Sequence, residues 1–79
     1  MKVRLLYFAS LADRAGRSEE TRETSARTPR DLYAEIAREH AFTFAPGRIR
    51  VAINGALSGW ERALAEGDEI VFLPPVSGG

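Results

Sequence analysis

The residues with the clearest chemical potential are Gly78 and Gly79, which close the 79-residue sequence. A Gly-Gly end has no side chains beside its α-carboxylate, so it can enter a narrow channel in another protein. That carboxylate is ionised at neutral pH, with a reference pKa of about 3.3–3.7, and it reacts poorly until ATP converts it to an acyl-adenylate. A sulfide equivalent can then displace AMP and leave a thiocarboxylate on Gly79.

The preceding residues would position this reactive end. Pro74 and Pro75 fix their own φ angles and lack an amide hydrogen, so they should end the last strand and direct the chain away from it. The four residues after Pro75 reach at most about 14 Å. We expect a folded domain in residues 1–75 and an extended tail in residues 76–79, although an ordinary frayed terminus is the alternative. The residues expected to thread a channel are Pro75, Val76, Ser77 and Gly78, with Gly79 reacting.

Composition limits the remaining possibilities. Eleven Lys and Arg residues balance eleven Asp and Glu residues, which argues against general nucleic-acid binding. The sequence has no Cys, so disulfides and cysteine-based zinc sites are excluded. No apolar run approaches the roughly 20 residues of a membrane span. We expect one cytoplasmic domain that binds no metal, cofactor, nucleic acid or membrane.

The best-marked element is a helix from Thr28 to His40, because Thr28 suits the N-cap and Pro29 suits the first helical position. A shorter helix is expected up to Ala15, with Ser10 as its cap. One long helix beside a mixed sheet of four to five strands is an α+β arrangement of the β-grasp type. Strands are predicted at Lys2–Phe8, Glu19–Ser25, Ile49–Asn54, near Leu57 and at Glu69–Leu73, with Glu19–Ser25 at an edge.

Alternation in the first and last strands predicts an apolar sheet face that the long helix does not cover. If Val3, Leu5, Ile70 and Phe72 meet the helix, the opposite side chains face away from it. Such a face is typical of a partner surface. The alternative is that the short helix or the loop at residues 42–44 folds over it. The residues predicted on this face are Leu6, Phe8, Val71 and Leu73.

A few other side chains have types that could form sites. His40 is the one imidazole, and we expect it to interact with the C-terminus of the long helix rather than to act in catalysis. Glu19, Glu20 and Glu23 match no metal-binding loop and are expected to face solvent. Trp60 is expected to pack, partly buried, against the short helix.

Over essentially its whole length, the chain resembles the small subunits of molybdopterin synthase. These are sulfur carriers of the ubiquitin-like β-grasp superfamily, related to the thiamine-pathway carrier. The specific motif is the ending Pro-Pro-Val, then a small residue, then Gly-Gly. The segments that carry the resemblance are KVRLLYFASLADRAG at the start, Val51–Gly55, Gly67–Ile70 and Phe72–Gly79.

This resemblance implies a specific chemistry. A ubiquitin-activating-type adenylyltransferase would use ATP to charge Gly79, and a sulfur donor protein would convert it to the thiocarboxylate. The tail would then insert into the large synthase subunit and pass sulfur to cyclic pyranopterin monophosphate, within a heterotetramer. The carrier would contribute no catalytic side chain. Phe8, Leu57 and Leu73 occupy the positions of the family's partner interface, and alternation adds Leu6 and Val71 to them.

Two other readings stay open. The chain could carry sulfur for thiazole synthesis or tRNA thiolation, or modify proteins as ubiquitin does. Lys2 is its one side-chain amine, so it is poorly equipped to form branched chains of itself. It could also be a non-catalytic β-grasp interaction module that uses the exposed apolar face.

Overall fold

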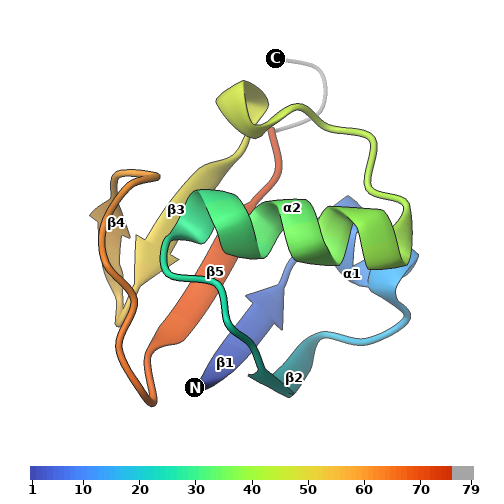
Figure 1. The fold of residues 1–79 in the computed structure, drawn as a ribbon. Coiled ribbons are helices and arrows are strands. Elements are labelled where there is room, and N and C mark those ends of the chain that lie inside the picture. Colours follow the sequence, from blue (N-terminus) through green and yellow to red (C-terminus); the bar gives the residue numbers. More distant parts are fainter. Residues whose placement is uncertain (76–79) are drawn as a thin grey trace.

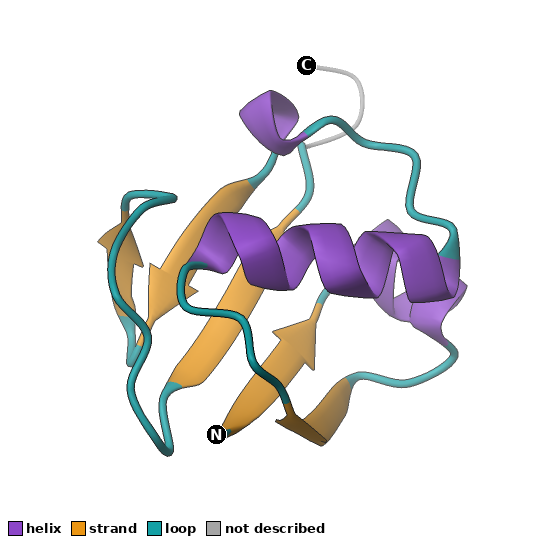
Figure 2. Cartoon of the chain, viewed as in Figure 1, coloured by secondary structure: helices purple, strands orange, loops and turns teal. Residues whose placement is uncertain are grey.

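A five-stranded sheet lies behind one long helix, as Figures 1 and 2 show. The computed structural model describes residues 1–75. The predicted α+β class is confirmed, with both main layers present. The elements are β1 (Lys2–Tyr7), α1 (Ala9–Ala15), β2 (Glu19–Glu23), α2 (Pro29–His40), a 3₁₀ turn η1 (Pro46–Arg48), β3 (Arg50–Ile53), β4 (Ala56–Ser58) and β5 (Glu69–Leu73).

The sheet is mixed, with the order β2-β1-β5-β3-β4. The inner strands β1 and β5 are neighbours that run parallel, and every other neighbouring pair is antiparallel. The prediction that the second strand is an edge is therefore confirmed. Because β1 and β5 run in the same direction, their C-terminal ends lie at the same edge of the sheet. The chain leaves β5 beside η1, at the top of the view in Figure 1.

Local signals explain α2. The Thr28 hydroxyl accepts a hydrogen bond from the amide of Asp31 at 3.2 Å, and Pro29 occupies the first turn. Both features were predicted from the sequence and are confirmed. The helix ends where Ala41 adopts a left-handed φ of 59° and its amide bonds to the Ala37 carbonyl. Its inner face buries Leu32, Tyr33 and Ile36 against the sheet.

The prediction that Ser10 caps the short helix is wrong. Phe8 is the N-cap residue, with extended backbone angles and no side-chain cap, and α1 begins at Ala9. The chain turns sharply here, because Ala9 takes a positive φ of 50° directly after β1. The Phe8 carbonyl accepts the first helical bond from Leu11 at 3.0 Å, so Ser10 already lies inside the helix. Gly16 ends α1 as predicted, in the left-handed region.

Alternating strand residues supply the core. Val3, Leu5, Tyr7, Ile70 and Phe72 all face α2, and each is at most 2% exposed. This confirms the side of the sheet predicted from alternation. The other members of the buried cluster are Leu11, Ala26, Leu32, Tyr33, Ile36, Ile49, Val51, Ile53 and Leu64.

In the described part of the chain, neither α1 nor α2 combines the length and the apolar composition that crossing a bilayer requires.

Hydrogen bonds of polar side chains join the β3–β4 turn to the start of β5. The Asn54 amide group donates to one oxygen of the buried Asp68 carboxylate at 2.9 Å, and the Ala65 amide donates to the other at 2.8 Å. These two hydrogen bonds hold the pKa of Asp68 below its usual value, and the bond from Ala65 has the larger effect. The side-chain oxygen Oδ1 of Asn54 also accepts a hydrogen bond from the Glu69 backbone amide at 3.0 Å. The Asn54 side chain therefore bonds to two consecutive residues, Asp68 and Glu69.

Asp68→Asn is expected to lower the free energy of unfolding by about 1.5–3 kcal/mol at pH 7, because it removes the charge of the acceptor and replaces one of its two oxygens with a donor. The folded pKa lies below the unfolded value of about 3.9. The stabilisation is therefore present above that value and is lost as pH falls through the folded pKa. Urea unfolding at pH 7 and pH 3 checks this, with exposed Asp13→Asn as the control. An equal difference between the two proteins at both pH values would contradict it.

Candidate functional site

The sheet face opposite α2 carries a continuous apolar row. Leu6 on β1 is paired with Val71 on β5, Val71 with Ala52 on β3, and Ala52 with Leu57 on β4. The row therefore crosses four of the five strands on one side of the sheet. Ala52 was not among the predicted interface residues; its pairing with Val71 places it in this row.

The five residues predicted for a partner interface share this face. Leu57 is 66% exposed and Phe8 is 50% exposed, which makes them the two exposed large hydrophobic residues of the described chain. The other three are half-buried. We call this set the apolar patch; its members are Leu6, Phe8, Leu57, Val71 and Leu73.

The alternative that local segments cover the apolar patch is wrong. Leu11 of α1 is buried in the core on the α2 side of the sheet. The loop at residues 42–44 also packs on that side, where Phe42 contacts the rings of Tyr7 and Tyr33. Leu11 and Phe42 cover the part of the core that the single long helix α2 does not reach. No other segment of residues 1–75 covers Phe8 and Leu57, which remain exposed.

One side of the apolar patch is bordered by compensated charges. Arg4 precedes Leu6 on the same face and is paired across the strands with Glu69. Its guanidinium lies 3.1 Å from the Glu19 carboxylate and 3.7 Å from that of Glu69. Such exposed pairs contribute little to stability, but here they balance the local charge.

The other side of the patch leads into a groove where the described chain ends. It has a volume of about 910 Å³. Trp60 forms part of its wall and stacks on Phe72 with a ring separation of 5.8 Å. The predicted packing of Trp60 against the short helix is wrong, since its ring meets Phe72 and Tyr33 of α2 instead. The groove is lined by Gly47, Arg48, Ile49, Arg50, Val51, Leu57, Ser58, Trp60, Leu73, Pro74 and Pro75.

The predicted tail begins at this groove. Pro74 and Pro75 follow β5 directly and are both half-buried in the groove wall. The predicted end of the sheet before Pro74 is therefore confirmed. Val76, Ser77, Gly78 and Gly79 lie outside the described residues, so their predicted roles stay predictions.

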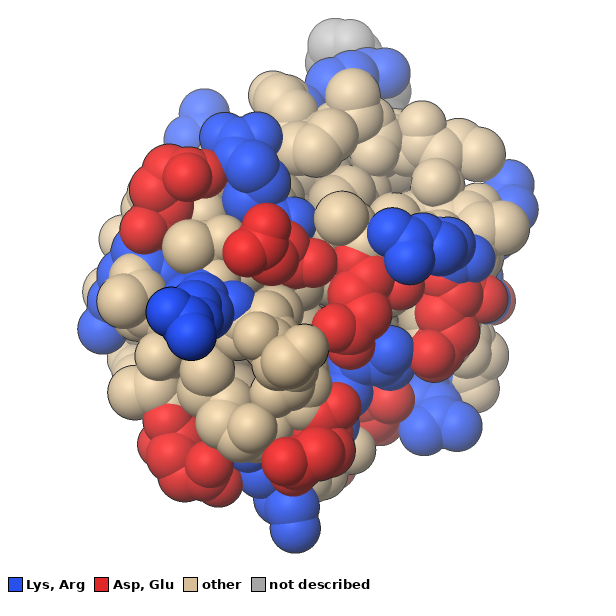
Figure 3. Space-filling view, in the orientation of Figure 1, with Lys and Arg blue, Asp and Glu red and all other residues tan. Residues whose placement is uncertain are grey.

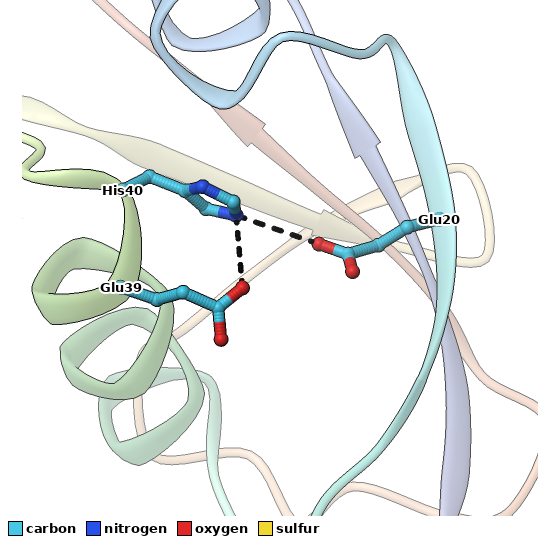
Figure 4. Close-up of side chains that lie close together, drawn as sticks. All are labelled: Glu20, Glu39 and His40. Carbon is cyan, nitrogen blue, oxygen red and sulfur yellow. Dashed lines mark ion pairs between the residues drawn. The ribbon is translucent and has the colours of Figure 1, made fainter.

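A second polar cluster lies away from the apolar patch, where α2 approaches β2 (Figure 4). The His40 Nε2 atom is 3.3 Å from the Glu39 carboxylate and 3.7 Å from that of Glu20. Possible metal-ligating atoms of these three residues lie within 4.8 Å of one another. The prediction that Glu20 faces solvent is wrong, because its side chain is only 11% exposed.

Neighbouring donors already engage both carboxylates of this cluster. Tyr7 donates its hydroxyl hydrogen to Glu20, and burial followed by this bond raises the pKa of Tyr7. Arg22 binds Glu39 through two nitrogens, at 2.8 and 3.1 Å, which raises the pKa of Arg22 and lowers that of Glu39. Because the Arg22 guanidinium already occupies the Glu39 carboxylate, this cluster forms ion pairs that join α2 to β2. Sequence reasoning missed it because its members come from separate elements.

Comparison with known proteins agrees with this geometry. The ThiS family model matches residues 5–79. The chain is 44% identical over 54 residues to the molybdopterin synthase sulfur carrier subunit of Haemophilus influenzae, an alignment that covers 58% of this chain and 67% of the relative. The resemblance inferred from the C-terminal motif is thereby confirmed.

Solved structures share the whole fold. SAMP1, the small archaeal modifier protein 1 of Haloferax volcanii, is 28% identical, with a TM-score of 0.81 and full coverage of both chains. A chain in the complex of subunits 1 and 2 of molybdopterin-converting factor from Helicobacter pylori is 25% identical, again over the full length of both, with a TM-score of 0.69. The predicted ubiquitin-like β-grasp fold is confirmed. On the match across residues 5–79, the chain belongs to the ThiS family.

Proposed function

We propose that this chain is the sulfur carrier subunit of a molybdopterin synthase. The observation that carries the proposal is the continuity between the apolar patch and the groove from which the chain leaves β5, since Leu57 and Leu73 belong to both. A protein that accepts the tail would therefore meet this face at the same time. The family match and the sulfur carrier of Haemophilus influenzae support the same reading.

In this proposal Gly79 carries the reacting group. Its carboxylate attacks the α-phosphate of ATP on an adenylating enzyme, which releases pyrophosphate and forms an acyl-adenylate. A sulfide equivalent from a donor protein then attacks the acyl carbon, AMP leaves, and a thiocarboxylate remains. The acid–base groups for these steps belong to the partners, because the side chains gathered on the apolar patch are hydrocarbon.

The acceptor of the sulfur would be cyclic pyranopterin monophosphate, bound to a large subunit. The Helicobacter pylori complex of subunits 1 and 2 of molybdopterin-converting factor supports such a partner, because one of its chains shares this fold over its full length. The patch suits a protein surface rather than a small ligand, since an exposed apolar face rimmed by polar residues marks such interfaces.

A protein modifier is the second candidate. The likeness to SAMP1 of Haloferax volcanii, over the full length of both chains, favours it. Both functions need an activated C-terminus, so activation alone does not separate them. Trapping the acceptor does: recovery of a pterin-binding subunit supports the carrier, and isopeptide adducts on lysines support the modifier.

Removal of Gly79 should abolish sulfur loading while the domain stays folded, because the buried core found among residues 1–75 lies between Val3 and Phe72. The protein would be incubated with an adenylating enzyme, ATP and a sulfur donor. Intact mass spectrometry should show a gain of about 16 Da in the full chain. A parallel incubation without ATP separates this gain from oxidation of Met1, which does not depend on ATP. Loading of a chain that ends at Gly78 would contradict the proposal.

Leu57→Glu should weaken binding to the large subunit by about tenfold or more, because it places a charge at the most exposed side chain of the apolar patch. Leu57 is 66% exposed, so the free energy of unfolding should change by only about 0.5 kcal/mol. Isothermal titration calorimetry measures the affinity. Ala34→Glu, at an exposed position of α2, is the matched control and should bind normally. Equal affinities for both variants would exclude the apolar patch as the interface.

A further inference from the structure

Two arginines stand where the described chain leaves the sheet. Arg50 is the first residue of β3 and is paired with Leu73, the last residue of β5. Arg48 is the last residue of η1, two positions earlier. Both side chains are exposed, and both residues line the groove together with Pro74 and Pro75. They therefore frame the exit of the chain from two different segments.

These two charges are not balanced within the described domain. Arg4, at the opposite border of the apolar patch, has carboxylate partners in Glu19 and Glu69. Neither Arg48 nor Arg50 forms an ion pair with a carboxylate of residues 1–75, and the guanidinium of Arg48 lies 5.8 Å from the centre of the Phe44 ring. Figure 3 shows basic atoms at the upper edge of the visible face and a mixture of basic and acidic atoms over the rest of it.

Building on the proposed function, we propose that Arg48 and Arg50 form a cationic rim that binds carboxylates of the adenylating enzyme at the mouth of its tail channel. Uncompensated arginines at the border of an apolar surface are suited to this, because a guanidinium binds a carboxylate through two parallel hydrogen bonds. Arginine is also enriched at protein interfaces, where complementary charge speeds association. The apolar patch would supply the contact area, and the cationic rim would set orientation and approach.

The length of the tail decides between two anions that such a rim could bind. The four residues after Pro75 span up to about 14 Å when extended. The phosphates of ATP would react with the carboxylate at the far end of that tail, deep inside the enzyme. Arg48 and Arg50 would stay at the entrance, next to Pro75. Side-chain carboxylates of the enzyme are therefore the partner we assign, and the nucleotide phosphates are not.

The test is pyrophosphate exchange by the adenylating enzyme, with the full-length carrier varied as substrate. The double variant Arg48→Glu/Arg50→Glu should raise the KM for the carrier by about tenfold or more at low salt, because like charges then face each other. Its kcat should be unchanged, since neither residue touches the reacting atoms. The defect should shrink near 1 M salt, where the Debye length falls to about 3 Å.

Arg38→Glu is the matched control. It makes one Arg→Glu change, half the charge change of the double variant, at an exposed position of α2, and its guanidinium has no ion-pair partner in residues 1–75. Its KM should stay within about twofold of the native value. Arg48→Gln/Arg50→Gln removes the charge without reversing it and should give an intermediate KM. Thermal unfolding of each variant separates a binding defect from a folding defect.

Three outcomes would overturn the cationic rim. One is a KM for the double variant equal to that of Arg38→Glu, and another is a defect that salt does not reduce. The third is a change in the KM for ATP rather than for the carrier, which would mean that the arginines bind phosphate. Failure of the proposed function looks different. Pyrophosphate exchange with isopeptide adducts in place of a pterin-binding subunit would exclude the sulfur carrier and leave the cationic rim standing, whereas no pyrophosphate exchange by the native chain would exclude both.

Discussion

Parallel pairing between β1 and β5 is the constraint on which the rest of the molecule depends. It places the N-terminal and C-terminal strands side by side at the centre of the sheet, although more than sixty residues separate Leu6 from its partner Val71. It also brings Phe8, at the end of one strand, to the same edge as Pro74, at the end of the other. The apolar patch and the exit of the chain thus arise from a single pairing.

The second constraint is that a single long helix can cover only one of the two faces of the sheet. α2, together with Leu11 and Phe42, encloses the side that holds Phe72 and the other core aromatic residues. The opposite side keeps hydrocarbon side chains that the described residues leave exposed at Phe8 and Leu57. In an isolated domain that exposure favours association. In the proposed sulfur carrier, the same exposure would allow one surface to bind several partner proteins in turn.

Sequence reasoning succeeded where signals were local and failed where the fold brings distant residues together. Thr28 and Pro29 mark α2 within one turn, and strand alternation separates the two faces correctly. Ser10 looks like a cap by its type, but the turn out of β1 shifts the start of α1 to Ala9. The environment of Glu20 depends on residues of β1 and α2 that no local pattern connects. The groove was likewise missed, because its walls come from η1, β3, β4 and β5.

The position of Lys2 has a consequence for polymers of this chain. Lys2 begins β1, so it lies at the edge of the sheet opposite to the one from which β5 departs. The strand between them spans roughly 20 Å, and this lysine is the only one in the sequence. An activated carboxyl group from a second molecule could join this amine. Because each molecule offers one lysine, the product would be an unbranched polymer in which all molecules are joined head to tail.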